Sequence, residues 1–180
     1  MIYYDIEDMI DDVLTAIADG TTGINARIDA INTQKAVVDA ARGRVVMTVP
    51  KFTYDLATVS TEGFKEGFNL FFFMVDEFTN ADPYLLVSID TWTTDELGAN
   101  IVSVNFHIAV EDTSDGTDPK RKLLRLIRAL REVLDVYVKE DAEIKASSIT
   151  QIEPDIAQVF FDETSKSFYS AGVRVNYTFA

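Results

Sequence analysis

Residues 1–43 carry the hydrophobic periodicity of helices. In the first stretch apolar residues recur every three or four positions and acidic residues fill most positions between them, which is typical of an amphipathic helix. The apolar stripe consists of Ile2, Ile6, Met9, Ile10, Val13 and Ile17. Gly20 is expected to end this helix. A second helix, with Ile24, Ile28 and Ile31 on one stripe, is predicted to end near Gly43.

From Val45 onward the pattern becomes that of strands and loops, and strands are predicted over residues 69–76, 84–92, 100–110, 144–152, 157–162 and 168–179. The clearest alternation lies in residues 100–110. One face there carries Val102, Val104, Phe106, Ile108 and Val110, and the other carries Ser103, Asn105 and His107. Such alternation indicates a sheet with one face in water, or with one face kept for a partner.

A long helix is predicted from Pro119 to about Lys139. Asp118 supplies the N-cap and Pro119 the first helical position. Its apolar stripe is Leu123, Ile127, Leu130, Leu134 and Tyr137. The order of elements predicts an α+β fold with a largely antiparallel sheet. We expect a single domain over residues 1–180, with a helical segment at 1–43 and the sheet plus the long helix at 44–180.

Composition narrows the function classes. The chain has 180 residues and no cysteine, so disulfides and thiolate metal sites are excluded. Its formal net charge of -14 repels phosphate backbones and argues against nonspecific nucleic-acid binding. No apolar run approaches the roughly eighteen residues of a membrane span, so no membrane partner is expected.

Candidate chemistry is sparse. The single histidine, His107, has no nucleophile or orienting partner that the sequence nominates, and the common nucleotide-binding and metalloprotease motifs are missing. Two acidic stretches were weighed as cation sites. Asp5, Asp8 and Asp12 are explained by the favourable position of acids near a helix N-terminus. The loop at 111–118 lacks the ligand order of a calcium loop. We therefore expect no enzyme activity, no cofactor and no metal.

One feature departs from the acidic background. Lys120, Arg121, Lys122, Arg125, Arg128 and Arg131 crowd into the front half of the long helix. Arg121, Arg125 and Arg128 share one face, away from the apolar stripe, and are expected to reach outward. Two main interpretations stay open: pairing inside the chain with the acidic first helix, or contact with an acidic face of a neighbouring subunit. Nucleic acid is a weaker third.

The candidate subunit-interface residues are Arg121, Arg125, Arg128, Ser103, Asn105 and His107. The first three form the basic face of the long helix. The last three form the polar face of the strand at 100–110, which a neighbouring copy would cover.

The layout of the chain resembles that of tailed-bacteriophage tail terminator (tail completion) proteins. The resemblance lies in the order of elements and in three segments: residues 23–32 (GINARIDAIN), 121–131 (RKLLRLIRALR) and 169–177 (YSAGVRVNY). It covers most of the chain, but none of these segments is a chemical signature. Residues 46–67 match no part of the family pattern.

The resemblance implies a small α+β subunit that forms a ring, usually a hexamer, which caps the tail tube and joins it to the head connector. Its partners would be copies of itself, tail-tube and head-connector proteins, and viral DNA that passes through the pore without specific binding. The expected location is the tail or neck of the virion, after synthesis in the host cytoplasm. Another head–tail connector or a baseplate subunit is the nearest alternative, and a small ligand-binding module is a further one.

Overall fold

A computed structural model gives the fold of the chain and describes residues 6–52, 68–70, 83–111, 117–135, 145–153, 159–160 and 167–179. Within these ranges the helices are α1 (Ile6–Ala18), α2 (Ile24–Ala41) and α4 (Pro119–Leu134). The strands are β1 (Phe68–Leu70), β2 (Tyr84–Thr94), β3 (Asn100–Glu111), β4 (Lys145–Glu153), β5 (Val159–Phe160) and β6 (Ser167–Phe179). The predicted α+β class is confirmed.

The strands form one sheet in the order β1-β2-β3-β6-β4, with β5 also paired to β6. All pairings are antiparallel except that of β1 with β2, which is parallel. The largely antiparallel sheet is therefore confirmed, although the parallel β1 was not foreseen. Of the strand predicted at 69–76, only the beginning lies within the described residues.

The predicted alternation is confirmed on the two central strands. Val102, Val104, Phe106, Ile108 and Val110 of β3 are buried, and so are Ala171, Val173, Val175 and Tyr177 of β6. Their register places Val104 opposite Val175 and Phe106 opposite Val173. Since side chains alternate between the faces of a sheet, this pairing gathers the apolar residues of both strands on one face.

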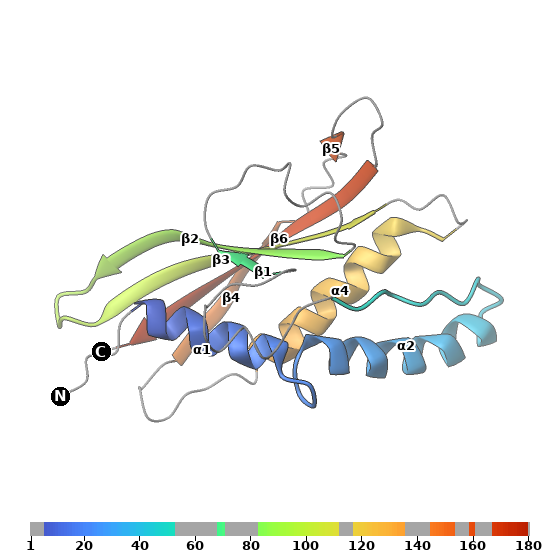
Figure 1. The fold of residues 1–180 in the computed structure, drawn as a ribbon, viewed down its shortest axis with the longest axis horizontal. Coiled ribbons are helices and arrows are strands. Elements are labelled where there is room, and N and C mark those ends of the chain that lie inside the picture. Colours follow the sequence, from blue (N-terminus) through green and yellow to red (C-terminus); the bar gives the residue numbers. More distant parts are fainter. Residues whose placement is uncertain are drawn as a thin grey trace.

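Helix α4 covers that apolar face. It packs on β3 and β6, while α1 and α2 pack on α4. Figure 1 shows α1 and α2 following one another along one side of the molecule, with α4 rising obliquely from their junction. Leu123, Ile127, Leu130 and Leu134 are buried as predicted, in one cluster with the apolar stripes of α1 and α2.

The ends of α4 agree only in part with the prediction. At the start, Asp118 accepts a hydrogen bond from the Lys120 N–H at 3.0 Å, as expected of an N-cap. The helix ends at Leu134 rather than near Lys139, and Tyr137 lies outside the described residues. The long helix is also not unique, because α2 has 18 residues and α4 has 16.

Residues 44–52 run extended beside α2, and we call them the strap. The chain reverses at Gly43, whose φ of 63° suits a residue without Cβ. None of residues 44–52 belongs to a strand, although they were assigned to the sheet part of the chain. Met47, Val49 and Phe52 are nevertheless buried in the core. The strap is thus part of the helical layer.

Two asparagines of α2 replace the missing strand partner of the strap. The Asn32 amide donates to the Val49 carbonyl at 3.0 Å and accepts from the Val49 N–H at 2.9 Å. Asn25 makes the same pair of hydrogen bonds with Phe52, at 2.8 and 2.9 Å. The two asparagines are seven positions apart, which places them on the same face of the helix, two turns apart.

Replacing Asn32 tests this attachment. Asn32→Leu leaves the N–H and carbonyl of Val49 without their partner, and we expect the free energy of unfolding to fall by about 1–3 kcal/mol. The matched control is Lys51→Ala, which removes only an exposed strap ion pair with Asp29 and should cost about 0–1 kcal/mol. Urea unfolding of both variants measures the difference, and equal values would show that the amide does not hold the strap.

Candidate functional site

The C-terminal end of α2 and the N-terminal half of α4 meet at a buried ionic group. Arg121 donates to Asp39 Oδ1 at 2.8 Å, and Arg125 donates to Asp39 Oδ2. Arg125 also donates from Nη1 to the carbonyl of Met47 in the strap, at 2.7 Å. Asp39 is 2% exposed and Arg125 is 7% exposed. This group joins three segments that are far apart in the sequence.

The pairing sets the charge state of Asp39. The hydrogen bond from Arg125 is the largest influence and holds the pKa of this carboxyl below its usual range, although burial opposes it. The positive charges of Arg125, Arg121 and Arg44 act in the same direction as the hydrogen bond. The carboxylate therefore stays ionised at neutral pH despite its burial.

These contacts correct the expectation that the basic face of α4 reaches outward. For Arg125 it is wrong, because this side chain is buried in its own chain. Arg121 is also paired within the chain. Internal pairing was one of the two interpretations, but the partner of both residues is Asp39 in α2 and not a residue of the first helix. Arg128 donates to Glu132 and to Gln34, at 2.7 and 2.9 Å, and remains partly exposed.

Two single substitutions separate the buried cation from the exposed one. Arg125→Met removes one of the two arginine partners of the buried Asp39 carboxylate and the donor to the Met47 carbonyl, and we expect it to lower the free energy of unfolding by about 3 kcal/mol. Arg128→Met removes a partly exposed i,i+4 pair and the exposed hydrogen bond to Gln34, and should cost only about 1 kcal/mol. Thermal and denaturant melting of the two variants checks this. Similar melting of both would mean that the buried group does not hold α2 against α4.

A pocket of about 180 Å³ opens beside the buried group. Val38 and Leu124 supply its apolar lining, and the charged lining residues are Lys35, Asp39, Arg42, Arg44, Arg121 and Arg125. Five cations thus face one carboxylate. Asp39 is already shared by Arg121 and Arg125, and no described carboxylate forms an ion pair with Lys35, Arg42 or Arg44. The pocket is therefore cationic in a chain of net charge -14.

The opposite end of the molecule carries an acidic and apolar hairpin tip, residues 95–99 between β2 and β3 (Figure 1). Asp95 Oδ1 accepts hydrogen bonds from the N–H groups of Leu97 and Ala99, each at 2.8 Å. The Asp95 N–H donates to the Ala99 carbonyl at 2.9 Å, and Gly98 has a φ of 88°. This turn leaves Leu97 94% exposed, with Glu96 exposed beside it.

The polar face of β3 is only partly open. Ser103 is 6% exposed, so it does not offer the contact surface that was expected of it. Asn105 is half-buried and accepts a hydrogen bond from Arg174 Nε of β6 at 3.1 Å. Arg174 also pairs with Asp90 of β2 at 3.3 Å. Asn105 thus belongs to a polar network across β2, β3 and β6.

His107 is exposed on the same face and lies opposite Gly172 of β6. A Cβ added at Gly172 would lie 3.5 Å from the imidazole Cε1 and Nδ1, so the ring rests against this position. Partial burial disfavours the charged imidazolium and lowers the pKa of His107. The imidazole is therefore predominantly neutral at pH 7.

This lowered pKa predicts an acid-dependent loss of stability. The unfolded chain takes up the proton near pH 6.5, before the folded chain does. The free energy of unfolding should then fall as the pH drops from about 6.5 toward the lower folded pKa. His107→Gln should remove this component. Urea melts at about pH 7.5 and about pH 5.5 measure it, and an unchanged pH dependence in His107→Gln would contradict it.

Among the described residues no group of three or more His, Asp or Glu side chains is placed to hold a metal ion. Asp5 and most of the loop at 111–118, which were weighed as cation sites, lie outside the described residues. In the same part of the chain no helix is both long enough and apolar enough to cross a bilayer.

No protein-family model matches the chain. No curated protein matches it either. The resemblance noted in the sequence therefore stays a prediction.

Several residues of these surfaces were missed in the sequence. Asp39 had a signal, because an acid in the last turn of a helix opposes the helix dipole and needs a partner. Leu97 also had a signal in the sequence, because an apolar residue in a polar turn seldom contributes to the core. Arg42 and Arg44 follow the end of α2. Nothing in the sequence around them predicted that they lie beside the arginines of α4.

Proposed function

We propose that this chain is a structural ring subunit of the tail or neck of a tailed bacteriophage, a tail terminator that caps the tail tube and joins it to the head connector. In this role the protein acts by assembly and carries no catalytic set. Its partners are copies of itself and the tube and connector proteins on either side. Viral DNA passes its acidic surface without being bound.

The observation that carries the proposal is the separation of charge between the two ends of the molecule. The pocket between α2 and α4 has three cations without a described carboxylate partner, Lys35, Arg42 and Arg44. The hairpin tip at the other end carries Glu96 and Leu97. Two different surfaces at opposite ends favour head-to-tail contacts, which close into a ring when the rotation permits.

The resemblance to tail terminators supports the same function independently of the charges. The three segments that carry it fall on α2, on α4 and on β6. In this proposal Arg121 and Arg128, the basic interface candidates that keep some exposure, lie near the contact. His107 lies on the polar sheet face and is the most exposed of the three candidates there.

Assembly is measured by native mass spectrometry and negative-stain electron microscopy of the purified chain over a range of concentrations. We expect closed rings of like subunits, alone or on purified tail tubes. Because the contact is between charges at the surface, rings should weaken as salt rises from about 0.1 M to about 1 M, where the screening length drops from about 10 to about 3 Å. A chain that is monomeric in every condition, tubes included, would contradict the proposal.

A further inference from the structure

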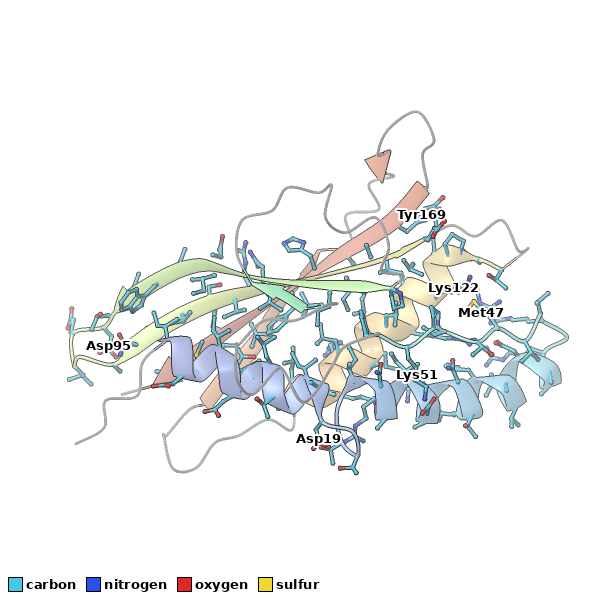
Figure 2. All side chains as sticks on the ribbon, in the orientation of Figure 1. Asp19, Met47, Lys51, Asp95, Lys122 and Tyr169 are labelled. Atoms are coloured by element: carbon cyan, nitrogen blue, oxygen red, sulfur yellow. The ribbon has the colours of Figure 1, made fainter. Side chains whose placement is uncertain are left out.

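The two ends of the molecule differ in shape as well as in charge. Figure 2 places Asp95 of the hairpin tip at one extreme, with Met47 and Lys122 near the opposite end, where α2 and the strap reverse. The tip is a narrow projection and the other end holds the pocket. We infer that the hairpin tip of one copy inserts into the pocket between α2 and α4 of a second copy, with Leu97 against Leu124 and Glu96 on the free arginines.

This inference rests on the proposed function and names the contact by which copies associate. The size of the pocket favours a side chain as its occupant. Pockets that hold cofactors or drug-sized ligands measure about 300–1,000 Å³, and this one measures about 180 Å³. Its apolar lining includes Leu124, which is 61% exposed in the single chain. Leu97 is the natural complement, because its side chain has no cover of its own.

The charges fit in the same orientation. No described carboxylate forms an ion pair with Arg42 or Arg44, whereas Asp39 is satisfied by Arg121 and Arg125. An incoming anion would therefore meet the free cations first. Glu96 is exposed and adjacent to Leu97, while Asp95 is occupied by the hydrogen bonds of the turn. Paired arginine–carboxylate contacts are short and directional, so they fix the register of two copies.

The tip is also prepared for insertion. The turn is fixed by the hydrogen bonds that the Asp95 carboxylate accepts and by those of the Asp95 backbone, and Gly98 adopts the left-handed conformation that the turn needs. A rigid projection loses little conformational entropy when it docks. Because tip and pocket are different surfaces, a pair of copies keeps one free tip and one free pocket, and the chain of contacts closes only through a ring.

Disulfide trapping tests the contact directly, because the chain has no cysteine of its own. Leu97→Cys is mixed under mild oxidation with Leu124→Cys, Val38→Cys or Lys35→Cys in a second, tagged copy. At least one pocket variant should give a cross-linked pair at a yield at least tenfold above Leu97→Cys alone. Thr33→Cys, an exposed position of α2 that does not line the pocket, is the matched control and should give only background.

A charge exchange gives a second measurement on the same contact. Glu96→Lys should weaken association at least tenfold by native mass spectrometry, and adding Arg42→Glu should restore most of it. Both positions are exposed, so melting should stay unchanged in each variant. Rings that form without any pocket cross-link and without response to Glu96→Lys would overturn this contact and leave the ring function standing. Cross-linked pairs that never close would support the contact and contradict the ring. No association at all would contradict both.

Discussion

The buried pairing of Asp39 with Arg125 and Arg121 is the interaction on which the helical layer depends. Arg121 and Arg125 are 82 and 86 positions from Asp39 in the sequence. The hydrogen bond from Arg125 to the Met47 carbonyl adds the strap to the same group. Buried ion pairs often contribute little net stability, because desolvation opposes the attraction. Their effect on specificity can be larger. Here Asp39 fixes the register of α2 against α4, since a shift by one turn would leave a buried charge unpaired.

The Asp39 pairing explains how the C-terminal part of α2 is held in position against α4. Its buried apolar residues, Ile24, Ile28 and Ile31, lie in the first half of the helix, whereas the buried residue of the second half is Asp39. From Asn32 onward the helix is therefore held by polar contacts: Asp39 to α4, Gln34 to Arg128, and Asn32 to the strap. Because the C-terminal end of α2 is held in this way, Arg42 and Arg44 stay at the edge of the pocket.

Local patterns in the sequence were sufficient for the elements but not for the site. The alternation of β3 and β6 and the stripe of α4 depend on neighbouring residues. The bounds of both strands and the start of α4 were predicted nearly correctly, whereas α4 ends at Leu134 and not near Lys139. The strap was not, because Met47 and Val49 alternate as in a strand while their hydrogen-bond partners are side chains of a helix. Arg125 was placed outward for a similar reason. Helical spacing puts it opposite the stripe, but α2 covers that face, and the covering helix is set by tertiary contacts that periodicity does not contain.

The charges at this end of the molecule also oppose the local rules for helices. An anion in the last turn of α2 and cations in the first turns of α4 are both disfavoured by the helix dipoles. Asp39 and Arg121 offset each other, and Lys120 lies 5.9 Å from the centre of the Tyr169 ring. Neutral residues in the last turn of α2 and the first turns of α4 would avoid this unfavourable interaction with the helix dipoles. Conflicts between local preference and the whole fold are expected where a surface serves a partner. The excess of cations around a single satisfied carboxylate is such a conflict, and the proposed contact with an anionic side chain of another copy would resolve it.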